Sequence, residues 1–266
     1  MNTTAPTAEM YWEATGSGPP VLLIAGTPGD AGQMTALAGE LAADHLVITY
    51  DRRGTSRSTR PPGWSSTTLE EQADDAASVL SAVGVSSAVV FGTSNGAAVA
   101  LELALRHANR TSHAIVHEMP LLSVVDDPAP VVAAIESAIG PAMQAGDLRA
   151  ALDAFLRFAF GGAIVDGWAP ELHQRMLSNA EMVFSVELPA FQAYRPDPDQ
   201  LAACTVPVTV LLGEDEQMPF FHQAAEWLAR HLGTTVGRAP GAHGAQFSDP
   251  RRLADTIRGI EAAGSP

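Results

Sequence analysis

Five consecutive residues, Gly92-Thr93-Ser94-Asn95-Gly96, have the types and the order that expose a reactive hydroxyl. They directly follow an apolar run at 88–91 and precede a helix-forming stretch at 97–107. A Gly-x-Ser-x-Gly sequence between strand and helix makes a sharp turn that holds the serine Oγ above the sheet edge. The helix N-terminus behind it favours developing negative charge. We therefore predict that Ser94 is a nucleophile, whereas outside this context the five residues would indicate only a Gly/Ser-rich turn.

A serine hydroxyl is a weak nucleophile, so the prediction requires a base that the fold brings close to it. His243 is the preferred candidate because it lies in a glycine-rich loop, residues 240–244, after the last predicted strand. A side chain in that loop can reach back over the sheet edge. The other histidines lie beside or on predicted strands or on helices, where structural roles are more common: His45, His107, His113, His117, His173, His222 and His231.

The elements that must position these residues are predicted from the hydrophobic pattern. Short apolar runs alternate with amphipathic segments, which is typical of a parallel sheet covered by helices. The fold class is therefore α/β, with a mostly parallel sheet flanked by helices. The predicted strands are 21–25, 46–50, 88–91, 114–117, 206–212 and 234–238, and the predicted helices are 34–43, 69–83, 97–107, 220–231 and 250–261.

This alternation stops between residues 120 and 200, where we find prolines and helical patterns but no convincing strand. We interpret 120–200 as a helical insertion into a core formed by residues 1–119 and 201–266. Its predicted helices are 131–139, 148–160 and 171–194. Aromatic residues supply its apolar interior, and some of them can line a pocket between the insertion and the sheet: Phe155, Phe158, Phe160, Trp168, Phe184 and Phe191.

The chain resembles the α/β-hydrolase superfamily over nearly its whole length. The resemblance rests on the turn at Ser94, the loop Gly26-Thr27-Pro28-Gly29 after an early strand, the charged turn 51–58 and the late His243, in the order that the family uses. We expect the charged turn, with Asp51, Arg52, Arg53 and Arg57, to pin its own loop by ion pairs rather than to bind an anionic substrate.

The resemblance implies roles for further residues. The backbone N–H groups of Thr27 and Asn95 would form the oxyanion hole, and residues 120–200 would be a cap. Members commonly have His-Gly where this chain has Ala25-Gly26. Since the expected donor is the N–H of the next residue, the hole is retained, but its support differs.

The family places the acid of the triad after either of two strands, and this chain offers carboxylates at both. Glu118 lies 24 residues after Ser94, at the position that haloalkane dehalogenases use. Glu216 and Asp215 follow the later strand, where the acid is more common. Whichever serves must accept a hydrogen bond from the histidine Nδ1–H. Glu118 is preferred, with Glu216 as the main alternative and Asp215 after it.

Composition excludes several other classes of protein. The 266 residues include 30 Asp and Glu against 15 Arg and no Lys, and the net charge of −15 argues against nucleic acid or a membrane as partner. A single cysteine, Cys204, cannot form an internal disulfide and favours a cytoplasmic location. The first twenty residues lack the pattern of a signal peptide, and no apolar run approaches the roughly 20 residues of a membrane span.

Together these observations predict a serine hydrolase without a cofactor or metal, acting on small hydrophobic or uncharged esters or lactones. Perhydrolase or haloperoxidase-like chemistry, carbon–carbon bond hydrolysis and natural-product tailoring would use the same residues. A non-catalytic receptor for a small ligand is the alternative from another class. A dehalogenase would need a carboxylate in place of Ser94. The sequence leaves open the exact substrate and whether the chain forms a homodimer.

Overall fold

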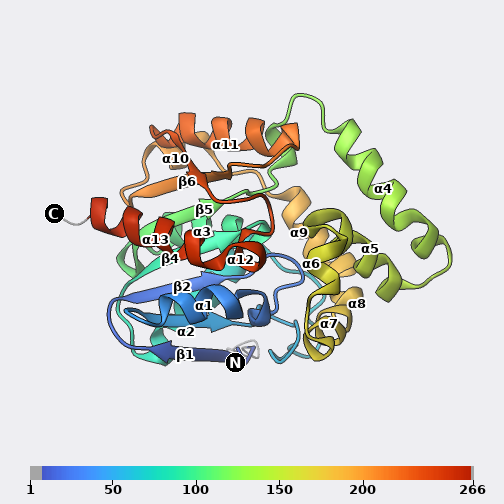
Figure 1. Ribbon diagram of the computed structural model, residues 1–266, viewed down its shortest axis with the longest axis horizontal. Coiled ribbons are helices and arrows are strands. Elements are labelled where there is room, and N and C mark those ends of the chain that lie inside the picture. The colour runs from blue at the N-terminus through green and yellow to red at the C-terminus, as the bar shows by residue number, and fades with distance from the viewer. Residues whose placement is uncertain (1–7, 265–266) are drawn as a thin grey trace, which may run out of the picture.

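A computed structural model describes residues 8–264 and contains one seven-stranded sheet (Figure 1). Residues 1–7 and 265–266 lie outside the described residues. Both stretches belong to the predicted core, and residues 1–7 also belong to the segment in which no signal peptide is expected. The strand order is β1-β3-β2-β4-β5-β6-β7, and all neighbours are parallel except β1 and β3. The predicted α/β fold class is confirmed. The strands are β1 (Trp12–Gly16), β2 (Pro20–Ile24), β3 (Leu46–Tyr50), β4 (Ala88–Thr93), β5 (Thr111–His117), β6 (Val208–Gly213) and β7 (Val236–Ala239).

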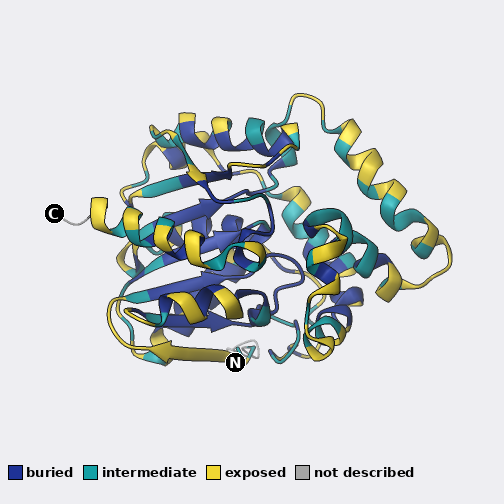
Figure 2. Cartoon of the chain, in the orientation of Figure 1, coloured by how far each residue is buried: buried dark blue, intermediate teal, exposed yellow. Residues whose placement is uncertain are grey.

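The sequence prediction missed β1. All five of its residues are exposed, so it carries no alternation between buried and exposed side chains, and Figure 2 shows it in yellow at the edge of the sheet. It is held by antiparallel pairing with β3, from Trp12 opposite Tyr50 to Gly16 opposite Leu46. Pairing with a strand that is far away in the sequence cannot be recognised from the local hydrophobic pattern.

Helices cover both faces of the sheet, and each face has its own apolar core. The central strands are buried between them (Figure 2) because parallel sheets need cover on both sides. On one face lie α1 (Thr35–Leu41), α12 (Ala245–Ser248) and α13 (Pro250–Gly264). On the other lie α2 (Leu69–Val83), α3 (Asn95–Arg106), α10 (Pro198–Ala202) and α11 (Pro219–Leu232).

Residues 120–200, which we call the helical segment, contain no strand, and most of their helices lie beyond one end of the sheet (Figure 1). The segment has an apolar cluster of its own, which includes Leu152, Leu156 and Val183. Its role as a cap stays a prediction. Before α10, its elements are a 3-10 helix (Leu122–Val124), α4 (Ala129–Gln144), α5 (Leu148–Phe160), α6 (Gly162–Asp166), α7 (Pro170–Leu177), α8 (Ala180–Met182), a π-helical turn (Val183–Glu187) and α9 (Leu188–Ala193).

The prediction of one continuous helix over 171–194 is wrong. The chain leaves helical geometry at Asn179, whose amide accepts from the Ser56 N–H and donates to the Ser56 Oγ. Pro189 then stands in the first turn of α9, where its missing N–H costs least. Contacts to the core therefore override a pattern that locally favours one helix.

A second contact between the helical segment and the core is an ion pair on α7. Arg175 donates to both carboxylate oxygens of the fully buried Asp30, at 2.6 and 2.9 Å. Asp30 also accepts from the Ser56 Oγ at 2.6 Å. These bonds tie α7 to the loop that follows β2. Within residues 8–264, no helix is both long enough and apolar enough to cross a bilayer.

Candidate active site

Ser94 lies at the junction of β4 and α3 with φ 55° and ψ −132°, a conformation that few non-glycine residues adopt. Close backbone contacts explain the flanking glycines. A Cβ on Gly92 would lie 2.2 Å from the Gly96 carbonyl oxygen, and a Cβ on Gly96 would lie 2.3 Å from that of Ile24. The turn is therefore as sharp as the sequence pattern predicts, and Ser94 is partly exposed at the carboxyl edge of the sheet.

His243 lies between two aromatic rings in the loop between β7 and α12. Its ring stacks on Phe221 of α11, with centroids 4.7 Å apart, and on Phe160 of α5, at 5.6 Å. Its Nδ1 is 2.9 Å from Oε2 of Glu118. The aromatic rings and the carboxylate together fix the plane of the imidazole and leave Nε2 for other partners.

Glu118 directly follows β5, and its buried carboxylate is held at both oxygens. Oε1 accepts from the Gly213 N–H at 2.8 Å, at the end of β6, while Oε2 faces His243. Burial alone would raise the pKa of Glu118, but the hydrogen bond to His243 and the adjacent histidines lower it below the usual value. The backbone φ of Glu118 is 47°, a second unusual conformation at this edge of the sheet.

The two other acid candidates are not hydrogen-bonded to His243. Oε1 of Glu216 accepts from the Met218 N–H at 2.6 Å, and burial raises the pKa of Glu216. Asp215 is exposed. Of the three carboxylates that the sequence offers, Glu118 is therefore the one in contact with the histidine.

Each of the seven remaining histidines has a ring hydrogen-bond partner other than Ser94. No group of three or more His, Cys, Asp or Glu side chains in residues 8–264 is arranged to hold a metal ion. The partners are Asp44 and Glu261 for His45, Asp74 for His107, Thr209 for His113, Thr93 for His117, Asp153 for His173, the Glu216 carbonyl for His222 and the Trp227 carbonyl for His231.

A pocket of about 160 Å³ opens beside Ser94 and His243. Its wall is made of apolar and aromatic side chains from the sheet edge, α11 and the helical segment. None of the described residues that line it is Asp, Glu or Arg. The lining includes Leu122, Ile135, Phe155, Phe158, Phe160, Leu188, Phe191, Met218, Phe220 and Phe221. Such a surface favours an uncharged, hydrophobic ligand.

Thr27 and Asn95, the two residues expected at an oxyanion hole, line the same pocket. They are joined by a hydrogen bond of 2.8 Å from Asn95 Nδ2 to Thr27 Oγ1. The Thr27 hydroxyl in turn donates to Glu187, a buried residue of the helical segment. Sequence reasoning missed Glu187, because a single glutamate in a helical pattern is normally solvated.

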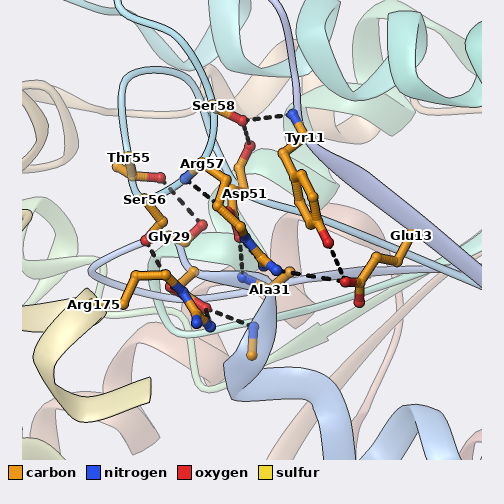
Figure 3. A network of polar contacts seen from close by, with 12 residues as sticks. Tyr11, Glu13, Gly29, Ala31, Asp51, Thr55, Ser56, Arg57, Ser58 and Arg175 are labelled. Carbon is orange, nitrogen blue, oxygen red and sulfur yellow. Dashed lines mark hydrogen bonds and ion pairs between the residues drawn. The ribbon is translucent and has the colours of Figure 1, made fainter. Parts of the chain in front are cut away.

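The charged turn after β3 has one internal ion pair, between Asp51 and Arg57, whereas Arg52 and Arg53 pair with carboxylates outside the turn. Asp51 accepts from the Arg57 guanidinium at 2.6 and 2.9 Å and from the Ala31 N–H at 2.7 Å (Figure 3). Figure 3 also shows Arg175 approaching this region from a helix of the helical segment. Arg53 pairs with Asp75. These contacts lie outside the pocket lining and fix the loops that flank it.

His117, the residue before Glu118, makes stability depend on pH. It is fully buried, and burial lowers its pKa from 6.5 to about 4. Between these values the unfolded chain binds a proton that the folded protein does not, so the free energy of unfolding falls as pH falls. This contribution is therefore complete above about pH 6.5 and is lost progressively towards about pH 4.

We predict that His117→Gln flattens this dependence. Removing one such group changes the slope of the unfolding free energy by up to ~1.4 kcal/mol per pH unit between about pH 6 and 4.5. Urea denaturation of both proteins across this range measures the slopes, and the difference between the proteins cancels the effect of every other titrating group. Parallel slopes would show that His117 does not remain neutral in the folded state.

Comparison with known proteins agrees with the fold. The profile of the family described as "alpha/beta hydrolase fold" matches residues 19–146. A putative carbamate hydrolase RutD from Azorhizobium caulinodans is 46% identical over 103 residues, 39% of this chain and 38% of that protein. A zearalenone hydrolase from Bionectria ochroleuca is 33% identical over 113 residues, 41% of this chain and 43% of that protein. The matches thus span less than half of both relatives.

The likeness of the folds extends much further than these sequence matches. A thermophilic esterase from Thermogutta terrifontis superposes with a TM-score of 0.75 over 99% of this chain and 97% of that chain, at 24% identity. That match includes both the sheet and the helical segment. With its strand order, its Gly-x-Ser-x-Gly turn between β4 and α3 and the match to the family model, the chain has the α/β-hydrolase fold.

Proposed function

We propose that this protein is a serine hydrolase that cleaves carboxylic esters or lactones of small, uncharged, hydrophobic substrates, with Ser94, His243 and Glu118 as its catalytic triad. The observation that carries the proposal is the contact between Glu118 and His243 beside the pocket that also contains Ser94. A carboxylate on Nδ1 leaves Nε2 as the nitrogen that accepts a proton from a hydroxyl.

In the first half of the reaction, Ser94 Oγ attacks the carbonyl carbon while its proton moves to His243 Nε2. The carbonyl oxygen becomes an oxyanion, which the backbone N–H groups of Thr27 and Asn95 stabilise. The intermediate collapses, the bond to the alkoxy oxygen breaks, and His243 gives its proton to that oxygen. The products are an acyl-enzyme and an alcohol, or a tethered hydroxyl when the substrate is a lactone.

In the second half, water attacks the acyl carbon and passes a proton to His243. The bond to Ser94 Oγ breaks, and His243 returns the proton to that oxygen. Glu118 stabilises the imidazolium in both halves without becoming protonated itself. Its lowered pKa supports this role, since the carboxylate stays ionised at neutral pH.

The apolar pocket and its uncharged lining support the substrate class. A fixed charge on the acyl group would be buried without a partner, which is costly. Carbamates are a second class to consider, because the RutD relative is named a carbamate hydrolase and a carbamate carbonyl can be attacked in the same way.

The test is hydrolysis of p-nitrophenyl esters of increasing chain length, with lactones and aryl carbamates in the same panel, combined with fluorophosphonate labelling. We expect uncharged acyl groups to be hydrolysed, a charged acyl group of equal length to be hydrolysed at least ~10-fold more slowly, and the label to be found on Ser94 by peptide mass spectrometry. A folded protein that neither takes the label nor hydrolyses any member of the panel would contradict the proposal.

A further inference from the structure

Glu187 is a buried carboxylate that the triad does not use. It is the last residue of the π-helical turn in the helical segment, and its side chain is 0% exposed. It lies far along the chain from the loop after β2, yet its carboxylate contacts that loop. Burying an ionised carboxylate is costly unless it is paired and hydrogen-bonded, so its partners carry information about its role.

A single oxygen of Glu187 joins two groups of the core. Oε1 accepts from the Arg52 guanidinium at 2.6 Å and from the Thr27 hydroxyl. Oε2 has no hydrogen-bond partner among the described residues. The directions of these bonds are fixed, because arginine can only donate and the one hydroxyl proton of Thr27 is given to Glu187.

The bonds continue from Thr27 to the residue after the proposed nucleophile. Thr27 Oγ1 accepts from Asn95 Nδ2 at 2.8 Å. The two residues whose N–H groups form the proposed oxyanion hole are thus linked through their side chains, and the link ends on Glu187. Both also line the pocket, so a shift of either would change the geometry at the carbonyl.

Arg52 supports the loop that follows β2 through hydrogen bonds to its backbone. Its guanidinium donates to the carbonyl oxygens of Ala25 and Gly26 at 3.2 and 3.3 Å, and to Gln72 Oε1 at 3.0 Å. Gln33 donates to the Gly26 carbonyl as well. Ala25-Gly26 is the place where the family commonly has His-Gly. In this chain, the loop is supported instead by Arg52, which Glu187 holds through the buried ion pair.

We propose that Glu187 is a positioning residue for the hydrolysis reaction, which orients Thr27 and, through it, Asn95 so that their N–H groups face the developing oxyanion. Because Glu187 belongs to the helical segment, that segment supports the proposed oxyanion hole through this one side chain. The inference rests on the proposed function and extends it. Positioning of this kind acts on the transition state more than on the bound substrate.

The first test replaces Glu187 or Thr27, the two residues that this hydrogen bond joins. We expect Glu187→Gln and Thr27→Val each to lower kcat for a p-nitrophenyl ester by about 10- to 100-fold, the loss that a small misplacement causes, with KM changed less than about 3-fold. Thr27→Ser keeps the hydroxyl and should restore most of kcat. The double variant should lose little more than either single variant, because both break one link.

The second test uses a trifluoromethyl ketone, whose adduct with the serine carries an oxyanion, and a non-reactive amide of the same shape as a ground-state ligand. The inhibition constant of the ketone should rise by the same factor as kcat/KM falls, while that of the amide stays within about 3-fold. Arg175→Met is the matched control, since it breaks the other ion pair between the helical segment and the core. It should leave the ketone inhibition constant within about 3-fold of wild type.

Three results would overturn the inference. These are an unchanged ketone inhibition constant in Glu187→Gln, an equal loss in Arg175→Met, and a Thr27→Val variant as active as Thr27→Ser. The last comparison decides the matter if Glu187→Gln does not fold. A wild-type protein without hydrolysis or labelling would instead contradict the proposed function, and the inference would fall with it; an active wild type with an equally active, folded Glu187→Gln contradicts only the inference.

Discussion

Replacement of Ser94 by alanine is expected to lower kcat/KM towards a short p-nitrophenyl ester by at least ~10³-fold, the loss typical of removing the nucleophile of such a triad. The residual rate would come from the oxyanion hole and from binding alone. The variant should fold normally, because alanine meets the same backbone restriction as serine at φ 55° and has no larger side chain. Steady-state kinetics with thermal denaturation measures both properties.

Ser56→Ala provides the matched control. Ser56 is also a serine with positive φ, at 50°, but it hydrogen-bonds Asp30 and lies outside the pocket. We expect its kcat/KM to stay within about 3-fold of wild type and fluorophosphonate labelling to persist. If Ser94→Ala kept the activity, Ser94 would not be the nucleophile. If it bound ligands as before and the wild type turned none over, the receptor alternative would be favoured.

The second large effect is expected for Glu118→Gln, with kcat lowered by about 10²- to 10⁴-fold. Both oxygens of Glu118 accept hydrogen bonds, one from Gly213 and one from His243. A glutamine has one oxygen and one NH₂ group, so it cannot satisfy both. If its NH₂ faces His243 Nδ1, the imidazole carries its proton on Nε2 and cannot accept the proton of Ser94. Without the negative charge, the imidazolium is also less stable.

Glu216→Gln is the control for this prediction, since Glu216 is the alternative acid and has a partner of its own in the Met218 N–H. We expect less than about a 3-fold change in kcat. Pre-steady-state release of p-nitrophenol measures the acylation step directly, and circular dichroism checks the fold of each variant. Equal, small effects of the two substitutions would contradict the proposed triad, and a large effect at Glu216 alone would assign the acid to the later strand.

Much of the fold could be predicted because parallel strands that are buried on both faces form continuous apolar runs. The runs at 46–50 and 88–91 correspond directly to β3 and β4. Helices 69–83 and 148–160 were also predicted to the residue, since a helical period and a following glycine define them. β1 could not be predicted in this way, because it is exposed and depends on its partner strand.

The candidate site likewise contains residues that could be predicted from the sequence and residues that could not. Ser94 and His243 are marked by local chemistry, a glycine-flanked turn and a glycine-rich loop. The choice between Glu118 and Glu216 depends on which carboxylate faces His243 in three dimensions, and both follow a strand that ends at the same sheet edge. Glu187 and the stacking of Phe160 on His243 arise from packing of the helical segment on the core. No sequence motif indicates either.

The π-helical turn at Val183–Glu187 places a condition on backbone geometry as well as on residue type. A π turn holds one residue more than an α turn, so the same residues wound as a regular α-helix would carry Glu187 about 100° further round the helix axis. Glu187 would then point away from Thr27 even with every side chain retained. Chimaeras that exchange the helical segment between relatives therefore have to keep the π turn if the exchanged part is to reach the core loop.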